Sequence, residues 1–531
     1  MTTSPGPVPR RAPIGLVAGF LTVGGWTMAS RVLGFARDIL MAAFLGAGPV
    51  AQAFVVAFTL PNLFRRFFAE GAFNTAFVPM FARRLEQGED AQGFAEDAFA
   101  ALASLLVLLT LVATLAMPWL VLGLASGFAG DQRFELATGL ARIAFGYILF
   151  ISLAALLSGV LNATGRFAAA AAAPALLNLI LIAALILAEA LAADDALQGL
   201  THGRFLVFGV LIAGIAQLAL VWRAAAQAGY PLRLRRPRWT PGLSRLAAVA
   251  LPAALAGGVV QINLVVGRQV ASHFDGAVAW LYLADRLYQL PLGVVGVAVG
   301  IVLLPALTRR LQAADAPGAR DAINRAAEIS LALTLPAAVA LVVIPGPLVA
   351  VLFGRGAFGP ADVAETARAV AIYGAGLPAF VLQKVVQPVY FAREDTKTPF
   401  RLALWVMLVN AALAIGLAPV IGYLASALAT TAAAWVYFAL LWRGARKIGP
   451  ETRIDAQLAR RLPRLALAAL SMGAAVAALA WALSGPLAAP FWRYAALLLL
   501  VSGGIAAYAL ACLALRAVTP RQIMAALRRR G

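Results

Sequence analysis

Residues 102–122 read LASLLVLLTLVATLAMPWLVL and contain no charged side chain. A transmembrane helix needs roughly 20 consecutive apolar residues to cross about 30 Å of hydrocarbon. Comparable apolar runs recur along the chain, for example at residues 176–191 and 465–483. Because hydrophobic residues make up 62% of the chain and charged residues only 12%, the sequence predicts a membrane protein that crosses the bilayer many times.

Division of the hydropathy pattern at glycine, proline and charged turns predicts an all-α polytopic membrane protein of about fourteen transmembrane helices. The expected spans are residues 13–44, 50–83, 93–122, 134–161, 168–192, 204–227, 241–272, 277–307, 325–353, 362–392, 399–417, 420–442, 463–484 and 491–516. No extramembrane domain fits between them.

Basic residues gather in alternate loops of this arrangement, at residues 233–238, 309–325, 393–401 and 443–464. Cytoplasmic loops of membrane proteins carry an excess of lysine and arginine. We therefore expect a multi-pass membrane protein with both termini in the cytoplasm.

Two parts of the chain repeat a pattern at the ends of the second and eighth spans. Residues 79–85 and 305–311 each contain a proline followed four residues later by two arginines and a leucine. Transporter folds are commonly built from such duplications. We predict two six-helix lobes, residues 1–227 and 228–446, followed by two appended helices and a cytoplasmic tail in residues 447–531.

Several classes of function are disfavoured by composition. The chain has one cysteine and two histidines, with no CxxC or HExxH pattern, so we expect no metal site and no cofactor. The net charge of +20 could suggest nucleic acid, but the basic residues lie in short loops rather than on a soluble domain. An enzyme acting on lipids would need a catalytic cluster in a sizeable loop, and we find none.

Charged side chains inside the first, second and eighth spans are the unusual feature of the sequence. A charge at the bilayer centre costs at least ~2.5–3.5 kcal/mol unless it meets water, a partner or a ligand. These residues are Arg31, Arg37 and Asp38 in the first span, Arg65, Arg66 and Glu70 in the second, and Asp285 and Arg286 in the eighth. The acids are too few to neutralise all of the arginines.

Two interpretations of these residues remain open. Arg37, Arg66 and Asp285 can be explained by snorkelling to the interface or by structural ion pairs. For Arg31, Arg65 and Arg286 we favour the second interpretation, in which arginines of both lobes line one cavity that binds an anion. Guanidinium groups bind phosphate oxygens in a bidentate manner, so a diphosphate joining a sugar to a lipid is a suitable ligand.

The segment SRVLGFARD at residues 30–38 resembles a signature of the MurJ/MviN family of lipid II flippases. Further segments resemble that family in the same order along essentially the whole chain. They are residues 60–73, 161–167, 282–286, 352–358 and 395–399. The resemblance implies the multidrug/oligosaccharidyl-lipid/polysaccharide exporter fold and an alternating-access mechanism.

The resemblance also implies site residues and partners. It implies that Arg31, Arg37, Arg65, Arg66 and Arg286 are required, and that the last two spans form a groove for a polyprenyl tail. The implied substrate is lipid II, the undecaprenyl-diphosphate-linked muropeptide of peptidoglycan and cell-wall biogenesis, and proteins of cell-wall synthesis are candidate partners.

The chain departs from the family at Gln52, where the family usually has an aspartate. An amide can hydrogen-bond, but it cannot pair ionically with an arginine. We assign Gln52 a supporting role with Asp38, Glu70, Asp285 and Lys384. Arg268, near the outer end of its span, is expected at the membrane interface.

The sequence therefore predicts a lipid II flippase whose arginine-lined central cavity binds the diphosphate-sugar head group. The main alternative is an exporter of drugs or other small molecules on the same fold. Such an exporter should favour acidic or aromatic residues for cationic drugs, which the arginines oppose.

Overall fold

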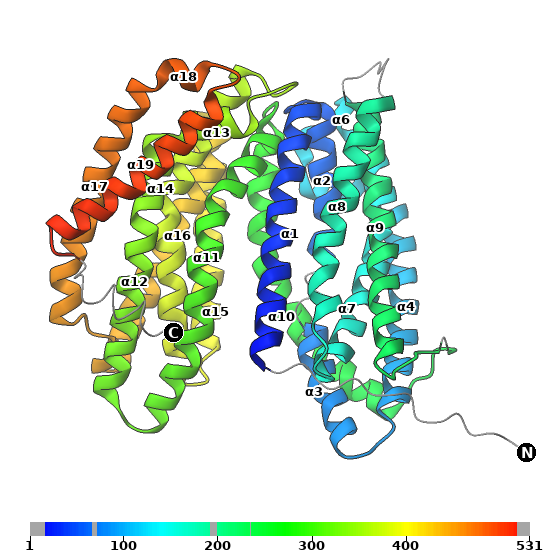
Figure 1. The fold of residues 1–531 in the computed structure, drawn as a ribbon. Helices are drawn as coiled ribbons and strands as arrows, with labels where there is room; N and C mark the ends of the chain where they lie inside the picture. Colours follow the sequence, from blue (N-terminus) through cyan, green and yellow to red (C-terminus); the bar gives the residue numbers. More distant parts are fainter. Residues whose placement is uncertain (1–15, 66–71, 192–198, 234, 518–531) are drawn as a thin grey trace, which may run out of the picture. The chain divides into compact units, whose positions relative to one another are not determined.

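The chain folds into helices over the residues that the computed structural model describes, which are 16–65, 72–191, 199–233 and 235–517 (Figure 1). Every predicted span contains a helix or a pair of helices, so the all-α polytopic architecture is confirmed. Among the described residues, ten helical segments are long and apolar enough to cross a bilayer.

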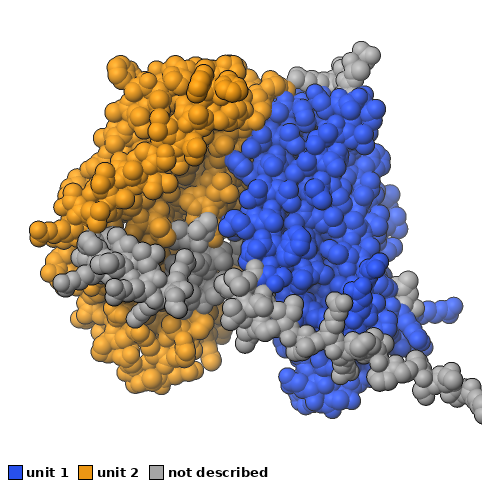
Figure 2. Space-filling model, viewed as in Figure 1, with its two compact units in different colours: residues 1–265 blue, residues 266–531 orange. Residues whose placement is uncertain are grey.

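Two compact units divide the chain, residues 1–265 and residues 266–531 (Figure 2). The boundary falls inside helix α10 (Pro241–Ser272). The predicted lobe boundaries at residues 227 and 446, and the internal duplication, remain predictions.

The described part of the first unit holds nine further α-helices. They are α1 (Leu16–Leu45), α2 (Pro49–Arg65), α3 (Ala72–Glu86), α4 (Ala91–Leu115), α5 (Met117–Leu124), α6 (Gln132–Ala144), α7 (Tyr147–Ala163), α8 (Ala168–Leu191) and α9 (Leu200–Gln227) within the described residues. Helix α8 packs between α1 and α9, and α2 packs on α6.

Nine α-helices follow α10 in the described part of the second unit. They are α11 (Ala277–Gln312), α12 (Ala316–Val343), α13 (Pro345–Phe353), α14 (Pro360–Phe391), α15 (Lys397–Ile421), α16 (Leu424–Ile448), α17 (Ala456–Ala482), α18 (Ser484–Ala488) and α19 (Arg493–Ala514). Helix α14 contacts α11, α12 and α16, while α17 lies against α12 and α19.

Small residues allow close helix packing in both units. A Cβ atom on Gly209 of α9 would lie 3.1 Å from the Cβ atom of Ala184 in α8. A Cβ atom on Gly374 of α14 would lie 2.7 Å from the Cβ atom of Leu341 in α12. Helices in a bilayer gain little from the hydrophobic effect, so such close van der Waals contact contributes to their association.

Two predicted spans are each broken into two helices by proline. The span at 93–122 separates into α4 and α5 at Ala116, two residues before Pro118. The span at 325–353 separates into α12 and α13 at Ile344, just before Pro345. Proline has no backbone N–H and disfavours the helical conformation in the residue before it. Hydropathy does not record this backbone effect, so it misses these breaks.

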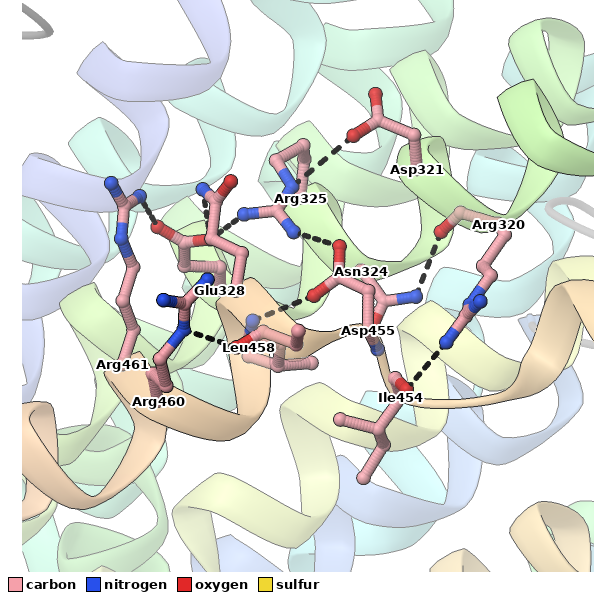
Figure 3. Close-up of polar contacts among 12 residues, drawn as sticks. Arg320, Asp321, Asn324, Arg325, Glu328, Ile454, Asp455, Leu458, Arg460 and Arg461 are labelled. Carbon is pink, nitrogen blue, oxygen red and sulfur yellow. Dashed lines mark hydrogen bonds and ion pairs between the residues drawn. The ribbon is translucent and has the colours of Figure 1, made fainter.

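An ionic network fastens the start of α17 to α12 (Figure 3). Glu328 of α12 binds both Arg325 of its own helix and Arg461 of α17. Arg325 also pairs with Asp455, whose Oδ1 accepts a hydrogen bond of 2.6 Å from the backbone N–H of Leu458 at the start of α17. Helix α17 is therefore held to α12 by charge as well as by apolar packing.

The backbone of residues 453–455, just before α17, is held to α12 by hydrogen bonds. Arg320 donates to the carbonyl oxygens of Arg453 and Ile454 at 3.1 and 2.7 Å. Asn324 accepts from the N–H of Asp455 at 3.1 Å and donates to the carbonyl of Arg453 at 3.1 Å. These contacts fix where α17 starts.

We expect Glu328→Gln to destabilise the protein by about 1–3 kcal/mol, because it removes the carboxylate shared by two partly buried guanidinium groups. The midpoint of thermal unfolding in detergent measures this. The matched control is Asp321→Asn, because Asp321 also pairs with Arg325, at 3.4 Å, but has a side chain that is 61% exposed. Surface pairs contribute ~0–1 kcal/mol, so the control should change little. Equal loss in both variants would contradict the role of Glu328.

Candidate functional site

The charged residues of α1 form a buried network with α8. Arg37 and Asp38 are only 6% and 1% exposed. Asp38 Oδ1 accepts hydrogen bonds from Arg37 Nη2 at 2.6 Å and Nε at 3.1 Å. Arg37 Nη1 donates to Asn178 Oδ1 of α8 at 3.0 Å. Arg37 is thus neutralised inside the first unit.

Asn178 joins the two helices by a second set of contacts. Its Nδ2 donates to the backbone carbonyl of Ser30 at 3.0 Å. A Cβ atom on Gly34 would lie 3.3 Å from this nitrogen, so glycine leaves room for the amide. Gly34 therefore allows the close approach of the Asn178 side chain.

Arg31 lies one to two turns before this network and differs from it. Its side chain is half-buried, and it makes no hydrogen bond or ion pair with the described residues. The carboxylate of Asp38, seven residues further on, is bound to Arg37 instead. Arg31 therefore retains its full set of guanidinium donors within the part of the chain that the structure describes.

Arg65 is the last residue of α2 and is half-buried. Its Nε donates to Asn62 Oδ1 at 3.3 Å, and Asn62 Nδ2 donates to the carbonyl of Phe58 at 2.8 Å. Arg66 and Glu70 lie outside the described residues.

Gln52 accepts from an arginine that the sequence analysis did not single out. Arg133 Nη1 donates to Gln52 Oε1 at 3.3 Å, while Arg133 Nε pairs with Asp131 Oδ2 at 2.6 Å. Burial opposes ionisation of Asp131, but hydrogen bonds from Arg133 outweigh it, so the pKa of this carboxyl is lowered. Asp131 thus provides the carboxylate that pairs with Arg133, because the amide of Gln52 carries no charge. The short Asp-x-Arg spacing at a helix start was the signal for this pair.

The second unit carries its charges on α11. Arg286 Nη2 donates to Tyr282 OH at 3.2 Å, and its guanidinium carbon lies 4.7 Å from the centre of the Tyr282 ring. Asp285 accepts a hydrogen bond from Gln289 one turn later. Arg286 and Asp285 are both half-buried.

Arg268 of α10 joins this group, although its side chain was expected at the membrane interface. It lies within electrostatic reach of Asp285, Arg286 and Tyr373 of α14. Its Nη1 has no accessible surface and no hydrogen-bond partner among the described residues. Among the described residues, this group contains two guanidinium groups and one carboxylate, that of Asp285, so its positive charges exceed its negative ones. Sequence position along α10 could not reveal the direction of this side chain.

Lys384 of α14 is exposed, whereas its polar neighbours are bonded within the unit. Gln383 Nε2 donates to the carbonyl of Ala434 at 2.8 Å, and Gln387 Nε2 donates to Tyr437 OH at 3.3 Å. The two glutamines hold α14 to α16, so they do not compensate the charge of Lys384.

Solved structures place this arrangement in a class of proteins. An inward-facing multidrug resistance MATE family transporter of the MOP superfamily matches with a TM-score of 0.60 and 15% identity, over 82% of this chain and 95% of that one. A lipid II flippase MurJ in an inward-closed conformation matches with a TM-score of 0.76 and 23% identity, over 92% of this chain and 97% of that one. The fold is that of the multi-pass membrane transporters of this superfamily.

The family follows from the sequence relatives. Residues 41–502 match the family described as lipid II flippase MurJ. A probable lipid II flippase MurJ of Rhizobium tropici is 48% identical over 87% of this chain and 86% of its own length. A lipid II flippase MurJ of Burkholderia cenocepacia is 38% identical over 82% of this chain and 84% of its own length.

The chain therefore belongs to the MurJ family, whose members are transporters rather than enzymes, and it is a multi-pass protein of the bacterial inner membrane. The family match begins after Arg31, Arg37 and Asp38, and it includes Arg65 and Arg286.

We expect Asp38→Asn to destabilise the protein by about 3–5 kcal/mol, because it leaves the buried guanidinium of Arg37 without its carboxylate. Unfolding midpoints of the purified protein measure the effect. The paired variant Arg37→Gln/Asp38→Asn removes both charges and should regain much of that stability. If Asp38→Asn unfolds like the wild type, Asp38 is not the counter-ion that the geometry indicates.

Proposed function

We propose that this protein is a flippase that moves lipid II from the cytoplasmic to the periplasmic leaflet by alternating access. The observation that carries the proposal is its close relationship, over most of its length, to lipid II flippases. The head group crosses the membrane inside the protein while the polyprenyl tail stays in the bilayer. No covalent bond changes in this cycle.

The diphosphate of the head group is the part of the substrate that the arginines bind. We assign Arg31, Arg65 and Arg286 to direct contact with its oxygens, with Arg37 and Arg66 assisting. Arg31 supports this role because its donors are uncommitted within the described chain, and Arg286 because its cluster has more cations than acids. A planar guanidinium fork matches two phosphate oxygens at once, which an ammonium group does not.

Arg268 extends the site beyond the residues found from sequence. Its buried Nη1 would be satisfied by a phosphate oxygen, and a bound anion would offset the positive excess beside Asp285. Asp285 then keeps the two guanidinium groups from repelling each other when no substrate is bound.

The remaining residues support the site indirectly. The contacts of Arg37 with Asp38 and Asn178 favour a positioning role, in which they hold α1 against α8 and so orient Arg31. Gln52 holds the start of α2 through Arg133, and Lys384 adds an exposed cation on α14. The same proposal places both termini in the cytoplasm and a groove for the polyprenyl tail along α17 and α19.

We expect Arg286→Ala to abolish export when it replaces the wild-type chain in cells depleted of this protein. The loss of hydrogen bonds to a charged group should weaken head-group binding by roughly 10- to 100-fold. The assay measures how much lipid II remains on the inner leaflet. Arg286→Lys, which keeps the charge but loses the fork, should restore export only partly.

The matched control is Arg368→Ala, because Arg368 lies in the same unit but is exposed and paired with Glu365 at 2.9 Å. This variant should export lipid II like the wild type. If depletion leaves lipid II export unchanged, the flippase proposal is wrong and a small-molecule exporter becomes the better reading.

A further inference from the structure

The motif FGRGAF at residues 353–358 is not used by the proposed transport site. It follows α13, at the end of the second unit where α17 finishes and α19 begins (Figure 1). Leu348 of α13 and Leu487 of α18 pack in one apolar cluster, so this loop and the connection from α17 to α19 are neighbours.

Arg355 of the motif turns back onto the end of α13. Its Nη2 donates to the carbonyl oxygens of Val351 and Leu352 at 2.7 and 2.9 Å. These carbonyls belong to the last turn of the helix, where no backbone N–H reaches them. The Nε of Arg355 is buried and has no hydrogen-bond partner among the described residues.

Arg493, the first residue of α19, approaches the same loop from the other side. Its Nη1 donates to the carbonyl of Gly354 at 2.9 Å, and its Nη2 donates to Tyr494 OH at 3.1 Å. The guanidinium carbons of Arg493 and Arg355 lie 5.1 and 5.6 Å from the centre of the same Tyr494 ring. The Nε of Arg493 is also buried without a partner in the described chain.

No acid neutralises these two arginines within the described residues. The carboxylates at the start of α14 are already committed to other groups. Asp362 accepts from Trp280 Nε1 at 2.8 Å, and Glu365 pairs with Arg368 at 2.9 Å and accepts from Tyr423 OH at 2.7 Å. The pair therefore keeps a charge of +2 that faces neutral carbonyl and hydroxyl oxygens.

Large exposed aromatic side chains lie at the end of α17 and directly before Arg493. Trp481, Phe491 and Trp492 are 82%, 84% and 62% exposed. Exposed tryptophan in a membrane protein is typical of the belt at the level of the lipid head groups. Arg355 and Arg493 therefore lie at the depth where lipid phosphates occur.

We propose that Arg355 and Arg493 form a binding site for the phosphate of an anionic phospholipid, in the leaflet that this end of the second unit faces. The phosphodiester oxygens would accept from the guanidinium donors that the backbone carbonyls leave free. The acyl chains would pass along Trp481 and the exposed face of α17. The site is separate from the proposed transport site and does not depend on the substrate carried there.

The charge of the pair selects the occupant. A zwitterionic phospholipid carries its own ammonium group, which would meet two uncompensated guanidinium groups. Phosphatidylglycerol has the phosphate without that cation, so its net charge is complementary to the pair. Each arginine removed should weaken phosphatidylglycerol binding by roughly tenfold or more, because hydrogen bonds to charged groups are lost.

The experiment compares the full chain in nanodiscs of phosphatidylcholine with nanodiscs that also contain phosphatidylglycerol. Wild type should unfold at a higher temperature when phosphatidylglycerol is present. This shift should disappear in Arg355→Gln/Arg493→Gln and persist in the control Arg368→Gln, which removes an exposed arginine paired with an acid. Arg355→Lys/Arg493→Lys, which keeps both charges, should retain part of the shift.

The difference between the two lipid mixtures separates binding from folding. If the arginines only fasten the α13 end to α19, the glutamine variant loses the same stability in both mixtures and keeps the phosphatidylglycerol shift, which overturns the proposal. A wild type without any shift overturns it even if the variants fail to fold. A larger shift from a polyprenyl diphosphate added to phosphatidylcholine discs, if it is lost in Arg355→Gln/Arg493→Gln, would assign the pair to the carried lipid instead.

Discussion

The cost of a guanidinium charge inside hydrocarbon is the constraint on which the account depends. Each such charge needs a carboxylate, other hydrogen-bond acceptors or a ligand beside it. Three arginines of the structure differ in the groups that lie beside them. Arg37 has Asp38 and the amide of Asn178, whereas Arg286 has the ring and hydroxyl of Tyr282. Arg268 lies near Asp285 and has a buried nitrogen without a hydrogen-bond partner among the described residues.

The neutralised charges and the uncompensated ones differ in what they do. The neutralised pairs hold helices together: Arg37 and Asp38 tie α1 to α8, and Glu328 ties α12 to α17. Removing one partner of such a pair costs stability. We propose that Arg31, Arg268 and Arg286 bind an anion instead. This division explains why one sequence feature, arginine in a membrane helix, supports both the fold and the proposed transport of a diphosphate.

Much of the fold was predictable from the sequence because hydropathy is a local property. Apolar runs of bilayer length predicted segments that all contain helices, and prolines at 118 and 345 account for two of the breaks that hydropathy missed. The bonding of Arg37 required knowledge of Asn178, which lies 141 residues away in the sequence. The contacts of Arg268 and Arg133 likewise depend on helix rotation and packing, which the spacing of residues along one helix does not determine.

The central claim is that the anionic diphosphate, rather than the lipid tail, is what the arginines recognise. The most direct test is equilibrium binding of lipid II to the purified full chain in nanodiscs, with two competitors that share the polyprenyl tail. We predict that polyprenyl diphosphate competes and that the uncharged polyprenol does not. If polyprenol displaces lipid II as well as the diphosphate does, the tail provides the recognition and the role of the arginines is contradicted.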